Sequence, residues 1–487
     1  LKVESYRVHS PTTLVGIERY LGSGLIDGIG PELAKRIVEK FGLSTLEVIG
    51  KEPQRLKEVS GIGESRAGKI SAAWAESQHL QDVMVFLRGH GVSTAFAVRI
   101  FKRYGNDAIN LIRQNPYRLA LEVWGIGFRT ADAIAQQLGM AKDAPARIEA
   151  GVVHALGKLA DDGHLHVPEH LLCEQAAELL QVGTDPCREA VDRLRTSNLV
   201  IREELGERGP CISLWRLWEA ETQAAAAFAS VAGEAAPEIG APVDEGILLF
   251  ERTAGFELAD AQRDAIRAAA ENTVVVITGG PGVGKTTIVR GIVELFAKGK
   301  KKIALAAPTG RAAKRLSEST LREAITIHRL LEYQPQTGGF ERGPERPIEA
   351  DLVIVDEASM IDIELFRALV LALAPRTRLV VVGDIDQLPS VGPGSVLADV
   401  ISSGAAEVIR LEEIFRQAAK SQIVVSAHAV NRGELPELAP PSGSDPFRSD
   451  FYFIGREDPN DALELLVDLV AERIPERFGF DPFRDLQ

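Results

Sequence analysis

The stretch Gly279-Gly280-Pro281-Gly282-Val283-Gly284-Lys285-Thr286 decides the fold class of this 487-residue chain. It satisfies the pattern G-x-x-x-x-G-K-[ST], follows a β-branched run at Thr273 to Thr278 and precedes a segment with helical periodicity. In that context glycines allow backbone N–H groups to surround a phosphate, and the start of the following helix adds its dipole. The stretch therefore predicts a phosphate-binding loop between a buried strand and a helix.

The loop assigns a role to each of its polar residues. Lys285 is expected to neutralise the β- and γ-phosphates of ATP, and Thr286 to ligate Mg²⁺. The alternative interpretation is a glycine-rich turn that binds nothing. We expect ATP to contact the whole loop and the next residue, namely Gly279, Gly280, Pro281, Gly282, Val283, Gly284, Lys285, Thr286 and Thr287.

Two carboxylates end a second apolar run about 70 residues further on, at Leu352 to Glu357. Asp356 is expected to hold Mg²⁺ through its coordinated water, and Glu357 to orient and deprotonate the attacking water. Surface acidic pairs are common. An apolar strand that delivers the pair to the carboxyl edge of a sheet, where such folds bind ligands, favours the catalytic interpretation.

Further short β-branched runs occur at Ile303 to Ala307 and Leu379 to Gly383, separated by helical segments. This alternation is typical of a parallel sheet with helices on both faces, so the fold from residue 258 onward is predicted to be α/β. The last of these runs leads into Gln387. Its amide both donates and accepts, so it could sense a γ-phosphate, or it could only stabilise a turn.

Glycine-centred turns recur in the first 140 residues, with first glycines at Gly28, Gly61, Gly89 and Gly125. Self-similarity at this period predicts a repeated unit of helix, tight turn and helix, and residues 1–140 are predicted to be tandem helix-hairpin-helix repeats. This segment holds 18 Lys and Arg against 14 Asp and Glu, whereas the whole chain has a net charge of −14. Only the N-terminal segment is therefore basic, as phosphate binding requires.

Residues 141–217 have a different residue pattern, in which helical periodicity is followed by short β-rich runs. Three helices closed by a hairpin would be a winged-helix-like domain. An alanine-rich helix and a Pro/Gly-containing linker are predicted over 218–257.

The composition excludes several classes of protein. No apolar run is long enough to span a bilayer, the chain shows no signal peptide, and its three cysteines form no CxxC pair. We expect the protein to be cytoplasmic, in the bacterial cytoplasm or nucleoid, and to have no membrane partner.

Five segments in order resemble the motifs of superfamily 1 helicases, and most of all the stand-alone RecD-like group with N-terminal helix-hairpin-helix repeats. The resemblance covers nearly the whole chain, and the ordered set of motifs is far more specific than any one of them. The resemblance implies two RecA-like lobes and an enzyme that uses ATP to translocate 5′ to 3′ on single-stranded DNA and unwind duplex, in DNA repair or recombination. The segments are Gly279 to Thr287, Ala307 to Ala313, Asp356 to Met360, Gly383 to Pro389 and Leu411 to Gln417.

The same resemblance assigns roles to single residues. Gln262 corresponds to a glutamine that reads adenine, Gln387 to a γ-phosphate sensor, and Arg416 to an arginine that reaches the γ-phosphate across the cleft. The implied DNA contacts are Pro308, Thr309, Arg311, Lys314 and His328.

The resemblance also divides the C-terminal part of the chain. It implies a first RecA-like lobe at 258–405, with a short hairpin insertion near 334–349, and the start of an incomplete second lobe at 406–487. The chain begins at Leu1 and lacks the later motifs, so we expect a longer protein.

The expected partners are single-stranded DNA and forked or tailed duplexes. The N-terminal hairpins can offer backbone N–H groups to DNA phosphates, although tandem repeats of this kind can instead dock a protein. Two other functions stay open: a RecA-type or other P-loop DNA-dependent ATPase that does not unwind, and a DNA-binding scaffold with a relic nucleotide site. The candidate N-terminal DNA contacts are Gly61, Gly63, Arg66, Lys69, Gly125, Gly127 and Arg129.

Overall fold

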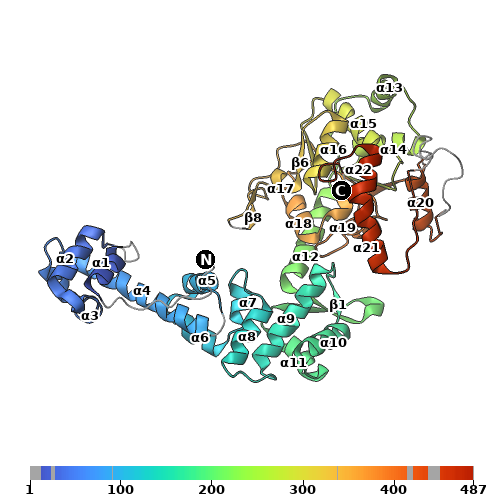
Figure 1. Ribbon diagram of the computed structural model, residues 1–487. Coiled ribbons are helices and arrows are strands. Elements are labelled where there is room, and N and C mark those ends of the chain that lie inside the picture. Colours follow the sequence, from blue (N-terminus) through green and yellow to red (C-terminus); the bar gives the residue numbers. More distant parts are fainter. Residues whose placement is uncertain are drawn as a thin grey trace. The chain divides into compact units, whose positions relative to one another are not determined.

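The computed structural model describes residues 13–22, 28–89, 92–336, 338–413, 421–436 and 450–485. The chain divides into two compact units, Leu1–Leu159 with His166–Trp215, and Ala160–Leu165 with Arg216–Gln487. Figure 1 follows the chain from blue to red. Among the described residues, no helix is both long and apolar enough to cross a membrane.

The first unit begins with a helical module that occurs twice. Gly42 and Gly105, 63 positions apart, have the same φ of 58° and follow corresponding helices. This distance spans two of the glycine turns, so the true repeat is a pair of those turns; His90 and Gly91 of the third turn lie outside the described residues. The first module contains α1 Leu14–Gly22, α2 Pro31–Phe41, η1 Gly42–Ser44, α3 Thr45–Lys51, η2 Pro53–Glu58 and α4 Glu64–Gly89, and the second α5 Thr94–Tyr104, η3 Gly105–Asp107, α6 Ala108–Gln114, α7 Arg118–Glu122 and α8 Phe128–Gln137.

Positive backbone angles explain the glycines that start the hairpins. Gly28, Gly61 and Gly125 have φ values of 88°, 92° and 84°, a conformation that L-residues with a Cβ rarely adopt. The middle residue of each hairpin, Ile29, Ile62 or Ile126, is buried. The Gly-Ile-Gly sequence therefore combines a tight turn with an apolar anchor.

A smaller module completes the first unit. It has the three helices and closing hairpin expected for 141–217, and β1 adds a short antiparallel strand beside β3. One apolar core extends from Val83 to Ile212, so no break in the core separates this module from the repeats at residue 140. Its elements are α9 Pro145–Asp161, β1 Val167–Pro168, α10 Glu169–Leu180, α11 Thr184–Thr196, β2 Val200–Glu204, η4 Gly206–Arg208 and β3 Pro210–Leu214.

The second unit contains a six-stranded sheet in the order β11-β4-β10-β9-β5-β6. Every neighbouring pair is parallel, which confirms the predicted α/β architecture. The carboxyl ends of all six strands therefore lie along one edge. The strands are β4 Val274–Gly279, β5 Ile303–Ala307, β6 Ala324–Thr326, β9 Leu352–Val355, β10 Arg378–Gly383 and β11 Glu407–Leu411.

Helices cover both faces of this sheet (Figure 1). Ile354 and Val380 face one core with α13, α14 and α15, whereas Val355 and Val381 line an apolar pocket with α18 and α19. This alternation explains why the strands are apolar throughout. The helices are α12 Trp215–Ala232, α13 Val243–Ala254, α14 Asp260–Glu271, α15 Lys285–Lys298, α16 Gly310–Thr320, α17 Ile327–Leu330, η5 Ala358–Met360, α18 Ile363–Leu371 and α19 Val396–Ser403.

The strand β11 changes a predicted boundary. The sequence analysis begins the second lobe at residue 406, but Glu407–Leu411 pairs in parallel with β4 and belongs to the first sheet. The weakly apolar run Glu407-Val408-Ile409-Arg410 hides this role because it lies at the edge of the sheet, where burial is incomplete. The boundary therefore lies after Leu411.

The remaining elements follow the sheet or are inserted into it. The predicted insertion near 334–349 contains a short antiparallel hairpin, which starts one residue earlier, at Tyr333. The described residues between 450 and 485 bury no side chain, so they add nothing to the core. These elements are β7 Tyr333–Gln334, β8 Gly339–Phe340, α20 Gln422–Asn431, α21 Pro459–Asp468, the π-helix Leu469–Arg473 and α22 Ile474–Phe478.

A buried arginine attaches the predicted linker to this sheet. Arg378, at the start of β10, is only 1% exposed and donates to the carbonyls of Pro237 and Ala270, the latter at 2.9 Å. Ala270 lies in the last turn of α14, so the guanidinium also satisfies a helix C-terminal carbonyl. Its carbon Cζ lies 5.3 Å from the centre of the Phe296 ring. The segment after α12 is therefore held against the amino edge of the sheet.

Replacing Arg378 by methionine should destabilise the second unit. The change leaves two buried carbonyls without this donor, and we expect the free energy of unfolding to fall by about 1–3 kcal/mol. Residues 233–242 should also become more sensitive to protease. Urea denaturation and limited proteolysis measure the two effects, with Arg376→Met, at an exposed position, as the matched control. An unchanged midpoint in Arg378→Met would contradict the assignment.

Candidate nucleotide site

The loop between β4 and α15 has a shape that its glycines make possible. Gly282 and Gly284 have φ values of 79° and 85°, and Gly284 is the N-cap of α15. A Cβ on Gly279 would come within 2.5 Å of the Leu411 carbonyl at the end of β11. Two glycines are therefore required by conformation and a third by the close approach of a neighbouring strand.

Lys285 folds back over this loop. Its Nζ donates to the carbonyl oxygens of Gly279 and Gly280, the latter at 2.9 Å. Thr286, the next residue, is exposed at the start of α15. The ammonium is thus held at the mouth of the loop by neutral acceptors, which anionic phosphate oxygens can replace.

Asp356 lies at the carboxyl end of β9, and β10 alone separates β9 from β4. Burial raises the pKa of Asp356 to about 6, and the neighbouring Glu357 carboxylate adds to the increase. The Glu357 N–H, which donates to Asp356 Oδ1 at 2.9 Å, and the charge of Lys285 oppose it. The sheet therefore brings Lys285 and the carboxyl pair close enough to interact.

Glu357 has an unusual backbone. Its φ is 54°, in the left-handed region that residues with a Cβ rarely occupy, and it stands directly before the short helix η5. Such strain persists only where the surrounding structure holds it, and it is concentrated at functional sites. Its buried neighbours Val355 and Ala358 supply that support.

These residues fit Mg²⁺ and ATP. Asp356 is a half-buried carboxylate that resists ionisation, and a divalent cation would remove that penalty. Thr286 offers the hydroxyl oxygen, a hard ligand of the kind that Mg²⁺ prefers. The loop and the start of α15 offer N–H groups and Lys285 to the phosphates.

Gln262 is buried, 2% exposed, at the start of α14. Its Oε1 accepts from the Ala259 N–H at 3.1 Å, and its Nε2 donates to the Val283 carbonyl at 3.1 Å. The amide therefore attaches the start of α14 to the phosphate loop. Contact with adenine stays a prediction.

Gln387 lies in the exposed turn after β10, the strand between the other two parts of the site. Its Nε2 is 3.4 Å from Oδ2 of Asp384, a buried residue whose Oδ1 accepts from the Asp386 N–H. The turn is thus organised around Asp384, which the sequence analysis did not single out. The sensor role of Gln387 stays a prediction.

The first predicted DNA segment follows β5 at the same edge of the sheet. Thr309 caps α16, because its Oγ1 accepts from the Ala312 N–H at 3.2 Å. Pro308 precedes this cap, and Arg311 and Lys314 are exposed on the helix. Lys314 reaches the carboxylate of Glu318 at 3.9 Å, a weak exposed pair.

The second predicted DNA segment carries an aromatic cluster. His328 is exposed on α17, and its ring lies 5.6 Å from that of Tyr333 and 5.7 Å from that of Phe340, on the two strands of the inserted hairpin. The Tyr333 and Phe340 rings lie 5.3 Å apart. The segment and the hairpin therefore form one local surface.

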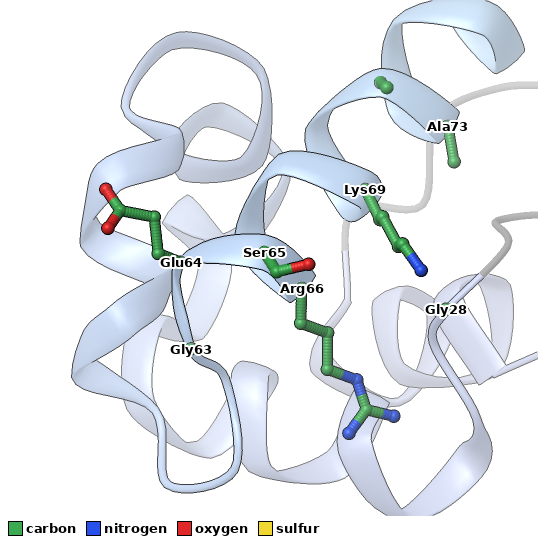
Figure 2. Close-up of a pocket in the computed structure, with 8 residues that line it drawn as sticks. Gly28, Gly63, Glu64, Ser65, Arg66, Lys69 and Ala73 are labelled. Carbon is green, nitrogen blue, oxygen red and sulfur yellow. The ribbon is translucent and has the colours of Figure 1, made fainter.

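Three of the four candidate residues of the first N-terminal module, Gly63, Arg66 and Lys69, line a hollow of about 880 Å³ (Figure 2). Arg66 and Lys69 extend from α4 toward the turn that carries Gly28, and Gly63 lies at the start of the same helix. Arg66 also donates to the Gly61 carbonyl at 3.4 Å. In the second module Gly125 opens the corresponding turn, Gly127 is the N-cap of α8, and Arg129 is exposed in its first turn.

His428 contacts the phosphate loop and was missed by the sequence analysis. Its Nε2 lies 3.2 Å from the Pro281 carbonyl, and a Cβ on Gly280 would come within 2.6 Å of its ring. A lone histidine 147 positions away carries no motif, so only the tertiary fold reveals this contact. Arg416 lies outside the described residues.

The mutation Asp356→Asn should stabilise the nucleotide-free protein. Because the folded-state pKa is raised above the value of an unfolded chain, ionised Asp356 opposes folding above about pH 6. We expect a gain of about 1–2 kcal/mol at pH 8 that disappears as the pH falls through 6 toward 4. Urea denaturation at pH 8 and 4.5 measures it, with the exposed Asp386→Asn as control. A loss of stability at pH 8 would contradict the burial argument.

Comparisons with known proteins agree on both regions of the chain. Residues 262–393 match the family model described as an AAA domain, residues 76–166 match the ATP-dependent RecD2 DNA helicase HHH domain, and residues 21–76 match a SAM-like helix-hairpin-helix tandem. A crystal structure of the Pif1 helicase from Candida albicans aligns with a TM-score of 0.30 and 25% identity, over 37% of this chain and 45% of that one.

Two curated relatives extend these matches. The ATP-dependent RecD2 DNA helicase of Deinococcus radiodurans is 34% identical over 420 residues, which are 84% of this chain and 58% of the relative. The RecD subunit of the RecBCD enzyme of Mycolicibacterium smegmatis is 41% identical over 183 residues, 32% of each chain. The chain thus spans less than two thirds of either relative. Since the similarity includes both the helix-hairpin-helix region and the P-loop domain, the chain is RecD2-like.

Proposed function

We propose that this chain carries the ATPase domain and the N-terminal DNA-binding region of an ATP-dependent DNA helicase. The observation that carries the proposal is the parallel order β4-β10-β9, which puts Lys285 and the pair Asp356 and Glu357 at one edge of the sheet, in a chain that is RecD2-like in both regions. The proposed enzyme translocates 5′ to 3′ on single-stranded DNA and unwinds duplex, in DNA repair or recombination in the bacterial cytoplasm or nucleoid.

Lys285 is the residue that would change partners when ATP binds. Its donors are occupied by the Gly279 and Gly280 carbonyls, and fully charged phosphate oxygens are stronger acceptors. The exchange would release both carbonyls and alter the loop. Binding of the nucleotide would in this way change the surroundings of His428, which lies against Gly280 and Pro281.

Glu357 is proposed as the general base for hydrolysis. Mg²⁺, held by Thr286 and Asp356, would neutralise charge that develops on the phosphates. A carboxylate that takes a proton from water needs a fixed direction, and the constrained left-handed backbone of Glu357 supports that role. Gln387 and Arg416 are proposed to respond to the γ-phosphate.

The DNA path is proposed to start beside the nucleotide. The strand β5 pairs with β9, so the segment with Arg311 and Lys314 begins one strand away from Asp356. Both side chains are exposed and can meet phosphates. The ring of His328, with the adjoining hairpin, would face bases where the duplex opens.

The proposed substrates are single-stranded DNA and forked or tailed duplexes. The N-terminal hairpins are proposed to hold the DNA tail through backbone N–H groups, with Arg66, Lys69 and Arg129 near the phosphates. Docking of a partner protein by the same repeats is the alternative. The salt dependence of DNA affinity distinguishes the two, since only phosphate contacts release counterions.

Two single substitutions should separate nucleotide binding from hydrolysis. Lys285→Ala should reduce DNA-stimulated ATP turnover by about 10² or more, because it removes a charge directed at the transferring phosphoryl group. Glu357→Gln should keep affinity for ATP and Mg²⁺ but lose most hydrolysis, because an amide cannot accept the proton. Nucleotide-binding titrations and ATPase assays with and without single-stranded DNA measure both. Near-normal turnover in Lys285→Ala would exclude the assignment, and lost affinity with intact turnover would make Glu357 a binding residue.

The polarity of unwinding can be tested directly. In the longest natural form of the protein that contains this chain, duplexes with a 5′ single-stranded tail should be unwound and those with only a 3′ tail should not. The Lys285→Ala form serves as the inactive control in a strand-separation assay. Equal unwinding of both substrates would reject the direction, and DNA-stimulated hydrolysis without any unwinding would favour a translocase or another DNA-dependent ATPase.

A further inference from the structure

Trp124 is the most exposed tryptophan of the described residues. It stands directly before Gly125 in the hairpin that opens α8, and the residue is 84% exposed, against 8% for Trp74 and 37% for Trp215. The residues on both sides of it in the hairpin, Val123 and Ile126, are buried. The hairpin thus fills the core with its aliphatic residues and leaves the indole outside.

Arg99 holds this indole in place. The guanidinium, on α5, donates to the Trp124 carbonyl at 3.1 Å, and its Cζ lies 4.9 Å from the centre of the indole. The Phe96 ring supports the same guanidinium at 5.6 Å. A cation over the ring and a bond to the same residue's backbone restrict the side chain, so little further entropy is lost when a ligand binds it.

The first module shows that the fold does not need the tryptophan. There Arg36, on α2, donates to the Ser60 carbonyl at 2.9 Å, directly before Gly61. Arg36 and Ser60 correspond to Arg99 and Trp124. The arginine-to-carbonyl bond is therefore common to both turns, whereas the indole is present in only one of them.

Two arginines of the second module have no acidic partner among the described residues. Neither Arg99 nor the exposed Arg129 forms an ion pair with a described carboxylate. Glu122, the acidic residue nearest in sequence, is bound by Arg118 at 2.7 Å. Asp132 is bound by Arg147 at 2.9 Å. We call Trp124, Arg99 and Arg129 the indole patch.

We propose that the indole patch binds an unpaired nucleotide of single-stranded DNA, with a base stacked on Trp124 and the adjacent phosphates near Arg129 and Arg99. An exposed aromatic residue with one cation on its ring and another in the first turn of the helix that follows matches the two parts of a nucleotide, and stacking tolerates any base. This inference rests on the proposed function and deepens it, because the contact goes to a base and not to the phosphates that hairpin N–H groups would hold. It assigns the second module to the unpaired tail.

The test measures binding of a fluorescein-labelled oligo(dT) to the whole chain over a range of salt concentrations. Trp124→Ala should weaken binding about tenfold with an unchanged salt slope, since stacking releases no counterions. Trp124→Phe should keep most of the affinity. Arg129→Gln should lower the log–log slope by about 0.7, the value for one phosphate contact on a single strand. Unlabelled oligo(dT) should quench the fluorescence of the wild-type chain more than that of Trp124→Phe.

Leu121→Ala is the matched control, because Leu121 is a 54% exposed apolar residue of the same module. It should bind like the wild type, and thermal unfolding should show that all variants fold. If Trp124→Ala binds with wild-type affinity, or if oligo(dT) quenches Trp124→Phe as much as the wild type, the inference is wrong, and a protein-docking role for the patch remains. DNA-stimulated ATP hydrolysis by the wild-type chain tests the proposed function separately, because that activity can be present whether or not Trp124 contacts DNA.

Discussion

The parallel alignment of β4, β10 and β9 is the constraint on which the candidate site depends. Because the three strands run in the same direction with β10 in the middle, their carboxyl ends bring the phosphate loop, the Asp384 turn and the Asp356–Glu357 pair to one edge. Backbone hydrogen bonds over buried valines and isoleucines hold that alignment. Residues about 70 positions apart therefore lie at one edge of the sheet, where the charge of Lys285 opposes the effect of burial on the pKa of Asp356.

The two edges of the same sheet enclose groups of opposite charge, a guanidinium at the amino edge and a carboxylate at the carboxyl edge. At the amino edge, the Arg378 guanidinium is bound by two carbonyls and covered by Phe296, so it fixes the chain between α12 and α13. At the carboxyl edge, burial raises the pKa of the half-buried Asp356, and Glu357 has a left-handed backbone. Burial disfavours the charge of both groups, since it lowers the pKa of Arg378 and raises that of Asp356. The fold supplies two carbonyl acceptors to Arg378, whereas Asp356 is suited to a cation that comes with a ligand.

The two N-terminal modules share one packing arrangement and differ in the residue that it leaves exposed. Two modules place an arginine on the carbonyl before a left-handed glycine, at Arg36 with Ser60 and at Arg99 with Trp124. Each bond fixes a hairpin whose middle isoleucine enters the core. The same turn forms with Ser60 in one module and with Trp124 in the other, so the fold does not require a tryptophan at this exposed position. The residue there can therefore be used for binding.

Local sequence determined the strands, the phosphate loop, the glycine hairpins and the carboxyl pair, because a buried strand needs a continuous apolar run and a left-handed turn needs glycine. It placed β4, β5, β9 and β10 to within a residue or two. It could not reveal that β11 joins the first sheet, that Gln262 bonds to Val283, that His428 reaches Pro281 or that Arg99 holds Trp124. The three side-chain contacts join residues that are 21 to 147 positions apart. The strand pairing joins the edge strand β11 to β4. Only the tertiary structure decided them, since they depend on which surfaces meet after the local elements have formed.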